Sequence, residues 1–498
     1  MNRHFITVLG TSLYTDCIYE VEGTDFGYRT PFVQMAVLRY IMPVCSEGDR
    51  ITVLLTEKAE EMNWRTRAYT EAERRRPAMK NMQPAAGEQK TGLRELLKRE
   101  YPDIPIESVR IKEGRNKAET DEIFEAIYGV IRPKEMVYFD FTHGLRNLPM
   151  QALTVIHYAK ALKDIQVGGM YYGAFELGER REDGEYYVNL LDMSACSTIL
   201  DWTSAAESFI KGGSSSQLKD LYKETVKPRK EQKNATQMIN RLCDLTSCLN
   251  TGRGKYDKND KNEKKSIQTA YNKFHDSYEK MCEDEQPVSD APLIRLLDHI
   301  RGDVNIFNRK YWIEKEGRRI ELENTATGMA AIQWAIDKNL TQQGFTALEE
   351  TIKTWLCESY EIPAGDKEER DGIVGRTLKF MANQQIRKIH PSGGSKEEEL
   401  SRGALKDRLL AEFLMDPGFE KRESEEKERY LKKIEKMVMN LSEELLDVSS
   451  AVSDQRNSLN HFGFQMHPAG YDKLQKNLVK RFEELQEIMK QDGVHITF

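Results

Sequence analysis

The sequence predicts an α/β domain of the doubly wound, Rossmann-like kind, followed by an all-α domain. Short apolar runs alternate with helical patterns over the first 200 residues, which is typical of an α/β fold with a parallel sheet. Beyond this region the pattern is almost entirely helical. At 498 residues the chain is also too long for one hydrophobic core. We therefore expect two domains, at residues 1–203 and 204–498.

In the first domain, six segments are predicted to contain strands, because each holds an apolar run bounded by turn residues. They are 4–12, 50–59, 108–114, 135–144, 165–176 and 185–193. The run in 135–144 is continuous, as expected for a strand that is covered on both faces. Helical spacing predicts helices at 117–131 and 148–162. Asp183 and Gly184 are predicted to turn the chain between the last two strands, which should close the sheet.

The second domain is predicted to be a set of amphipathic helices that follows a break at 212–216, where two glycines precede three serines. The expected helices are 201–210, 237–249, 267–281, 291–300, 328–340, 345–358 and 473–489. A strand is expected only at the end of the chain, at 494–498. The segment 251–265 has the composition of a charged insertion, and the pattern assigns no role to the larger region 225–330.

Composition narrows the class of protein. With 39% hydrophobic and 31% charged residues and a formal charge of −7, the chain is expected to be soluble, cytoplasmic and not associated with a membrane. The net acidity does not exclude nucleic acid, because a local basic groove matters more than total charge. The seven cysteines are scattered without a zinc-binding pattern, so neither a metal ion nor a cofactor is expected.

Three loops should meet at the carboxyl edge of the predicted sheet, where open α/β sheets bind their ligands. They follow the strands at 4–12, 50–59 and 135–144, and they offer small residues, hydroxyls, amides and two cations. The candidate binding residues are Gly10, Thr11, Ser12, Thr56, Lys58, Thr142, His143, Gly144, Arg146 and Asn147. Such a surface suits a phosphorylated nucleotide.

The same residues restrict the chemistry at this edge. Gly10-Thr11-Ser12 lacks the G-x-G-x-x-G turn, which removes the main support for a dinucleotide-dependent dehydrogenase. His143 could be a ligand contact, a general base, or a residue that merely shapes a tight turn, and the residues alone leave these alternatives open. Asp140 is expected to be buried and to accept backbone hydrogen bonds.

The segment 139–153, with 111–127 before it and 170–176 after it, closely resembles the D-x-T-H-G subgroup of CARF domains. These domains occur in CRISPR-associated ancillary nucleases of the Csx and Csm type in type III systems. The resemblance covers roughly residues 1–200. It implies a Rossmann-like dimer that binds a cyclic oligoadenylate across its twofold axis. The implied contacts are Gly10, Thr11, Ser12, Thr142, His143, Gly144, Arg146 and Asn147.

A second motif, R-N-x-x-x-H at 456–461, lies in the helical half. RNA cleavage without a metal needs proton transfer and positive charge at the phosphate, tasks suited to histidine and arginine. On a helix, Asn457 and His461 lie one turn apart, while Arg456 points about 140° away from His461. Ser453 or Asp454 was expected to cap this helix, and Gly463 to end it. Taken alone, this spacing is more often accidental than catalytic.

Within a C-terminal helical domain, this motif resembles that of HEPN ribonucleases, which recur as partners of CARF domains. The family implies a metal-independent active site at a homodimer interface, where two copies of Arg456, Asn457 and His461 meet. Single-stranded RNA would be cut by its own 2′-hydroxyl, leaving a 2′,3′-cyclic phosphate, as part of antiviral defence. We expect activation by cyclic oligoadenylate, with cyclic tetra-adenylate favoured and cyclic hexa-adenylate as the alternative.

Two other functions remain open from the sequence. The chain could be a cyclic-nucleotide sensor or scaffold with no nuclease output, in which the Arg–His motif is structural. It could also cleave its own activator slowly in the N-terminal domain, since His143 and the nearby hydroxyls leave that possibility open.

Overall fold

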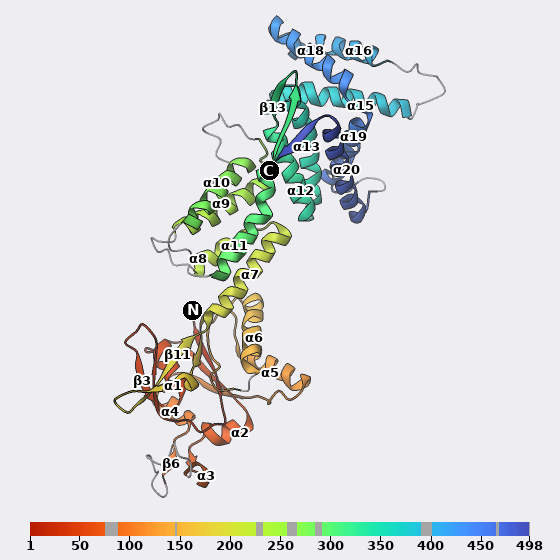
Figure 1. Cartoon of the computed structure of the whole chain (residues 1–498). Coiled ribbons are helices and arrows are strands. Elements are labelled where there is room, and N and C mark those ends of the chain that lie inside the picture. Colours follow the sequence, from red (N-terminus) through yellow and green to blue (C-terminus); the bar gives the residue numbers. More distant parts are fainter. Residues whose placement is uncertain are drawn as a thin grey trace. The chain divides into compact units, whose positions relative to one another are not determined.

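The structure is a computed structural model. It describes residues 1–74, 88–144, 147–225, 233–255, 266–283, 291–389, 401–464 and 468–497. The chain divides into two compact units, Met1–Asp201 and Trp202–Phe498, whose elements are labelled in Figure 1.

The first unit is built on a mixed sheet with the strand order β3-β2-β11-β9-β8-β1-β4-β7, and with β10 paired to β11. The strands are β1 (Arg3–Leu9), β2 (Cys17–Glu20), β3 (Gly27–Thr30), β4 (Arg50–Leu55), β7 (Ile106–Arg110), β8 (Met136–Asp140), β9 (Gln166–Gly173), β10 (Glu179–Arg180) and β11 (Tyr186–Asp192). The five strands from β9 to β7 run parallel, as the continuous apolar runs predicted.

The expected closure of this sheet by its last two strands is wrong. β9 and β11 pair antiparallel, and the predicted turn is present, with Gly184 at a φ of +83°, but it joins the short strand β10 to β11. However, β2 pairs with β11 and extends the sheet, and β3 pairs with β2. A separate two-stranded ribbon, β5 (Arg67–Ala68) with β6 (Gln89–Lys90), lies outside the sheet. These strands are only two to four residues long, too short to show an apolar period in the sequence.

Helices cover both faces of the sheet, which makes the first unit doubly wound. Phe5 and Leu9 of β1 share a core with α1 (Val33–Ile41) and α4 (Leu93–Glu100). The alternate residues Ile6 and Val8 pack with α5 (Lys117–Val130) and α6 (Leu148–Lys163) on the other face. The two helices α5 and α6 match the predicted segments closely.

The second unit is predominantly helical, as predicted. Its longer helices, with α7 leading into it, are α7 (Ser194–Gly212), α8 (Ser216–Thr225), α9 (Lys233–Asn250), α10 (Ile267–Glu283), α11 (Ala291–Val304), α12 (Glu323–Asp337), α13 (Thr341–Ser359), α15 (Arg376–Ile389), α16 (Arg402–Leu414), α18 (Ser424–Asn440), α19 (Glu443–Asn460) and α20 (Tyr471–Gln491). Most of the predicted charged insertion, from 256 to 265, lies outside the described residues.

The all-α expectation needs one correction, because the second unit contains a three-stranded sheet with the order β13-β12-β14. The terminal strand was predicted and is β14 (Val494–Thr497). It pairs with β12 (Lys310–Lys315), which forms a hairpin with β13 (Arg318–Glu321). Tyr311 and Ile313 are buried, while the alternate residues Lys310, Trp312 and Glu314 are more exposed. Charged residues on the solvent-facing side made this alternation of buried and exposed residues difficult to recognise in the sequence.

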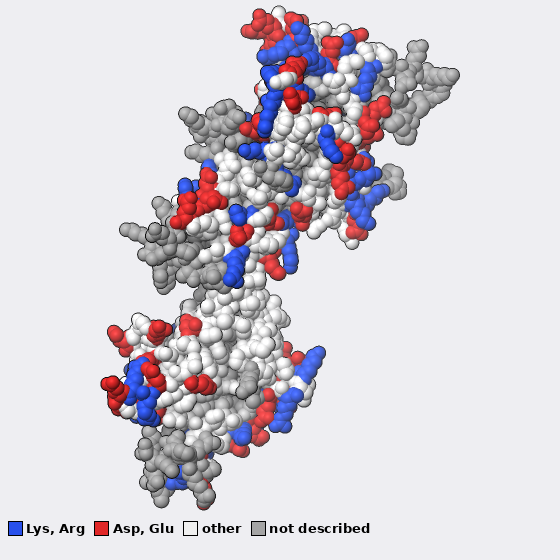
Figure 2. All heavy atoms as spheres, in the orientation of Figure 1, with Lys and Arg blue, Asp and Glu red and all other residues white. Residues whose placement is uncertain are grey.

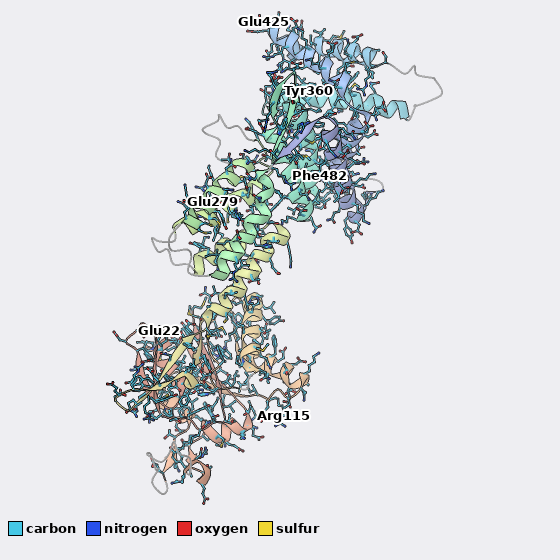
Figure 3. All side chains as sticks on the ribbon, viewed as in Figure 1. Glu22, Arg115, Glu279, Tyr360, Glu425 and Phe482 are labelled. Carbon is cyan, nitrogen blue, oxygen red and sulfur yellow. The ribbon has the colours of Figure 1, made fainter. Side chains whose placement is uncertain are left out.

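Two hydrophobic cores stabilise the second unit, and α12 contributes to both. Met329 and Ile332 belong to a core with α13, α18, α19 and α20, whereas Ala330 and Trp334 belong to a core with α7 to α11. Phe482 of α20 is buried in the first of these cores, and its place among the packed side chains is seen in Figure 3.

Acidic and basic side chains are intermixed on the face of the molecule shown in Figure 2. The mixture of signs is typical of solvated helix faces and loops. Among the described residues, no helix combines the length and the apolar character that crossing a membrane requires.

Candidate functional site

The carboxyl ends of β1, β4 and β8 bring the predicted loops to one edge of the first unit. Leu9 at the end of β1 pairs with Leu55 at the end of β4, and Thr7 pairs with Asp140 at the end of β8. The residues that follow these strands therefore lie at the same edge, as the sequence predicted. Arg146 lies outside the described residues.

Asp140 is an anchor for the motif loop. Its carboxylate is fully buried and accepts hydrogen bonds from the Thr7 hydroxyl at 2.6 Å and from the Thr142 N–H and hydroxyl at 3.1 and 2.6 Å. The Thr142 hydroxyl in turn accepts the Gly173 N–H at 2.8 Å. Burial raises the pKa of Asp140, and the bonds from Thr142 and Thr7 oppose that rise. The expected role of Asp140 as a buried acceptor is confirmed, and Thr142 ties the loop to β9.

His143 stacks on Tyr14, with ring centroids 4.1 Å apart and ring planes 23° apart. The Tyr14 hydroxyl accepts the Gly10 N–H at 2.7 Å, so one tyrosine joins the loop after β1 to the motif loop. Burial lowers the pKa of His143 to about 4, which leaves the imidazole neutral at neutral pH. Its Nε2 is buried and finds no hydrogen-bond partner among the described residues. This nitrogen is therefore a polar group whose partner could be a ligand.

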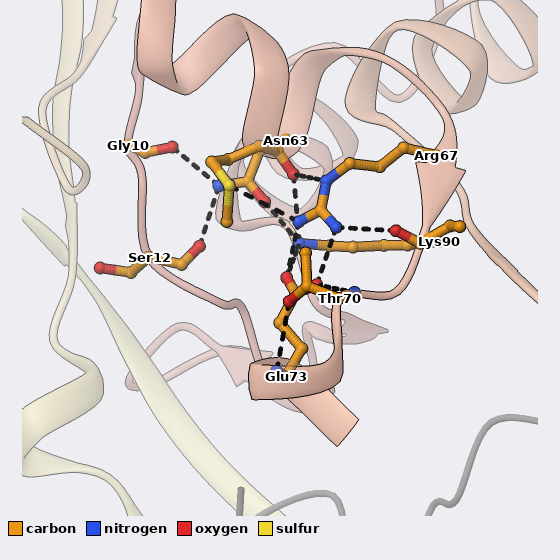
Figure 4. Close-up of polar contacts among 9 residues, drawn as sticks. Gly10, Ser12, Asn63, Arg67, Thr70, Glu73 and Lys90 are labelled. Carbon is orange, nitrogen blue, oxygen red and sulfur yellow. Dashed lines mark hydrogen bonds and ion pairs between the residues drawn. The ribbon is translucent and has the colours of Figure 1, made fainter. Parts of the chain in front are cut away.

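The loop after β1 is held from behind by Asn63. Its side-chain amide donates to the carbonyl oxygens of Gly10 and Ser12, both at 2.8 Å (Figure 4). The backbone N–H groups of Thr11 and Ser12 donate to no other described residue, and both residues are exposed. Consecutive N–H groups without a partner in the protein can form a small anion-binding surface, which suits a phosphate.

Thr56 and Lys58 contribute differently. The Thr56 hydroxyl accepts the Ala59 N–H at 3.2 Å and so caps the short helix α2 (Glu57–Ala59). Lys58 lies in that helix and is exposed, and it forms no ion pair with another described residue. Thr56 thus shapes the edge, while Lys58 remains able to attract an anion.

Gly144 and Asn147 pack closely against their surroundings. A Cβ added at Gly144 would lie 3.0 Å from a Leu148 methyl and 3.3 Å from a Val8 methyl, so these side chains would have to shift to admit it. Asn147 is the first residue before α6, and its amide nitrogen lies against Gly114, whose φ is +74°. The loop after β7 therefore also reaches this edge, which the sequence did not indicate.

The C-terminal motif lies at the end of α19. This helix begins after Ser442, whose hydroxyl accepts the Leu445 N–H at 3.1 Å. Ser453 and Asp454 lie inside the helix, so the prediction that one of them caps it is wrong. The apolar positions that bury α19 continue upstream of both residues, and this pattern outweighs their cap preference.

The end of α19 was predicted correctly. His461 is its C-cap, and its N–H donates to the Asn457 carbonyl at 3.0 Å. Phe462 and Gly463 then adopt φ values of +58° and +72°, and the Gly463 N–H donates to the Ser458 carbonyl at 3.0 Å. This left-handed turn is the ending for which glycine is preferred.

The three motif residues point in two directions. Arg456 is partly buried, with its Nε 3.4 Å from a carboxylate oxygen of Glu349 on α13. Asn457 and His461 are exposed, and no described residue forms a hydrogen bond with either side chain. Arg456 and His461 therefore differ in direction, as predicted from the rotation of each residue about the axis of a helix.

Large exposed aromatic side chains follow the motif in the sequence. Phe462 and Phe464 are 88% and 89% exposed, and Tyr471 at the start of α20 is 82% exposed. Exposed apolar groups that gather in one short segment commonly mark an interface.

A further cavity of about 1150 Å³ lies between α12 and α13 in the second unit. Its walls combine neutral polar side chains such as Thr327 and Gln343 with apolar ones such as Trp334, and they include the paired Arg370 and Glu350. Neither motif lines it, and nothing in the sequence pointed to it. Among the described residues, no group of three or more metal-binding side chains gathers in either unit.

Comparison with known proteins gives one relative by sequence. No family model matches the chain. It is 22% identical over 288 residues to the CRISPR-associated protein MJ1674 of Methanocaldococcus jannaschii, a match that covers 56% of this chain. The match covers 39% of MJ1674, so the chain spans about two fifths of its relative's length. The chain is therefore similar to a CRISPR-associated protein over more than half of its own length.

Among solved structures, the chain aligns with Enterococcus italicus Csm6 bound to cyclic hexa-2′-fluoro-hexa-dAMP. The alignment covers 99% of this chain and 94% of that one, with 10% identity and a TM-score of 0.37.

Proposed function

We propose that this chain is a CARF–HEPN endoribonuclease of type III CRISPR systems, activated by a cyclic oligoadenylate. One observation carries the proposal. Asn457 and His461 stand exposed at the end of α19, beside aromatic side chains that are almost fully exposed, as expected of half a site that a second copy completes. The similarity to a CRISPR-associated protein supports the biological setting.

The activator would bind at the carboxyl edge of the first unit. The N–H groups of Thr11 and Ser12 would receive a phosphate, and Nε2 of His143 would meet a polar group of the nucleotide. We favour cyclic tetra-adenylate, with cyclic hexa-adenylate as the alternative, because an even ring can share a twofold axis with the protein.

A dimer of the first unit has a matching surface. Met150, Tyr158 and Leu162 on α6 are 74%, 45% and 59% exposed, and their spacing places them along one side of the helix. Since α6 begins beside the motif loop, a second copy on this surface would bring two carboxyl edges close together.

The cleavage chemistry would use the motif residues of two copies. His461 would transfer the proton at the attacking 2′-hydroxyl or at the leaving 5′-oxygen, and Arg456 would stabilise the charge that builds on the phosphate. Asn457 would orient the RNA. The products would be a 2′,3′-cyclic phosphate and a 5′-hydroxyl, formed without a metal ion. Arg456 would exchange its contact with Glu349 for the phosphate.

Activation would be a shift in the population of arrangements of the second unit. The activator can produce this shift only by binding the competent arrangement more tightly. Moving a population from 1:99 to 99:1 requires about 5.5 kcal/mol of such preference. Several favourable phosphate and base contacts would be needed to supply it.

The alternative is a sensor or scaffold with no nuclease output, which the Arg456–Glu349 contact favours if it is purely structural. The deciding experiment is cleavage of a fluorescent single-stranded RNA in EDTA, without activator and with cyclic tri-, tetra- and hexa-adenylate in separate reactions. We expect strong cleavage with one ring size. Binding of a ring without cleavage would favour the sensor, and loss of cleavage in EDTA would contradict the metal-independent mechanism.

A further inference from the structure

We propose that Asn63 and Lys90 form a positioning pair that holds the loop Gly10–Ser12 in the shape that receives the activator's phosphate. This inference rests on the proposed function of the first unit. Neither residue lies on the main sheet or in either motif: Asn63 belongs to η1 (Glu60–Trp64) and Lys90 to the separate β5–β6 ribbon. Both converge behind the loop, as the close-up in Figure 4 shows.

The contacts of Asn63 allow only one orientation of its amide. The side chain is fully buried, and its Nδ2 donates to two carbonyl oxygens, those of Gly10 and Ser12, at 2.8 Å each. Its Oδ1 accepts the Lys90 ammonium at 2.6 Å. An ammonium has donors only and a carbonyl oxygen has no proton to donate, so rotating the amide by 180° would spoil all three bonds.

Lys90 is an unusual residue for this place, because its side chain is only 9% exposed. Its other contacts are longer: the Met62 carbonyl lies at 3.4 Å and the Glu73 carboxylate at 3.8 Å. Glu73 is mainly engaged by Arg67, which donates two hydrogen bonds to it at 2.7 and 2.6 Å. Burial lowers the pKa of Lys90 to about 8. The side chain therefore still carries its charge at neutral pH, although burial disfavours the charged form. A buried charge of this kind contributes little to the stability of the fold. Its presence is better explained by the orientation that it imposes on the Asn63 amide.

The consequence for the loop follows from its hydrogen bonds. With the carbonyl oxygens of Gly10 and Ser12 held toward Asn63 and the Gly10 N–H bound to Tyr14, the unpaired N–H groups of Thr11 and Ser12 are left for a ligand. Without Lys90, Oδ1 of Asn63 would be buried without its charged donor. The amide would then be less firmly held in the position from which it donates to the two carbonyl oxygens, and the phosphate site would lose its fixed shape.

The test uses the full-length chain and the variants Lys90→Met and Asn63→Asp. Lys90→Met keeps the apolar stem and removes the ammonium, and Asn63→Asp replaces the two N–H donors with an oxygen. Lys98→Met, which changes an exposed lysine on α4, is the matched control. Affinity for cyclic tetra-adenylate and cyclic hexa-adenylate is measured by calorimetry, and RNA cleavage is followed across an activator titration.

We expect both variants to weaken binding of the effective ring by about 10-fold or more, while the cleavage rate at saturating activator stays near that of the wild type. Hydrogen exchange of the loop amides, measured in the ligand-free protein, should accelerate in both variants and should not change in Lys98→Met. This measurement still tests the positioning role if a variant has a lower melting temperature. Unchanged affinity and unchanged exchange would overturn the positioning role alone. Failure of the wild type to bind either ring would overturn the proposed function, and this inference with it.

Discussion

At the scale of single residues, His461 is the side chain whose chemistry can be tested most directly. If it transfers a proton during RNA cleavage, His461→Ala should lower the activated cleavage rate by roughly 10²-fold or more, with no change in activator affinity. His299→Ala, which removes an exposed histidine outside both motifs, is the control and should retain activity. Wild-type cleavage by His461→Ala would exclude histidine as the acid or base.

His143 makes a second residue-scale prediction, about stability and pH. Its pKa is about 4 in the folded chain against an ordinary value of 6.5, so between these pH values the unfolded chain binds more protons. The contribution of His143 to stability should therefore be lost as the pH falls from 6.5 toward 4. Melting temperatures of the wild type and His143→Gln, measured from pH 7 to 4.5, should converge as the pH falls. Parallel curves would show that His143 is not protected from protonation.

The sequence indicated some of these residue roles and missed others for a physical reason. Asp140 was predicted as a buried acceptor because it ends an apolar strand, and the structure confirms this. Tyr14, Asn63 and Lys90 were not singled out. Asn63 reaches Gly10 across 53 positions and Lys90 reaches Asn63 across 27, and such contacts leave no periodic signal in the chain.

At the scale of elements, the start of α19 can be tested with two serines. Ser442 caps the helix through the Leu445 N–H, so Ser442→Ala should lower stability by about 0.5–2 kcal/mol. Ser453 lies within the same helix, where alanine has the higher helix propensity, so Ser453→Ala should be neutral or slightly stabilising. Denaturant unfolding of the two variants measures the difference. Equal losses would contradict the observed start of the helix.

Elements with a strong periodic pattern were predicted well, and those with one open face were not. The parallel strands β1, β4 and β8 show continuous apolar runs because helices cover both of their faces. The β12–β13 hairpin has only alternate residues buried, and its turn residues Glu316 and Gly317, with φ values of +53° and +71°, are set among charges. Its composition therefore resembles that of a solvated helix or loop.

At the scale of the whole molecule, the exposed aromatics after the motif predict assembly of the active site from two copies. The double variant Phe462→Ser/Phe464→Ser should lower activated RNA cleavage by about 10-fold or more, because interface aromatics carry much of the binding energy. Activator affinity should not change. Leu414→Ser/Met415→Ser alters another exposed apolar pair, 52% and 81% exposed, and serves as the control.

Cleavage is best measured over a range of protein concentrations, with self-association followed by sedimentation. If the aromatic variant is defective only because pairing is weaker, high concentration should restore part of its activity. Full activity of this variant at all concentrations would contradict an active site shared between copies.

The helix α12, which serves two cores at once, has a consequence for how the second unit can be divided. Met329 and Ile332 face one core, while Ala330 and Trp334 face the other. Truncating the chain on either side of α12 would therefore expose an apolar surface that is buried in the intact unit. Truncated forms that end just before or begin just after this helix should aggregate and should not yield a working module. The two halves of the second unit should therefore fold and unfold together, as one cooperative whole.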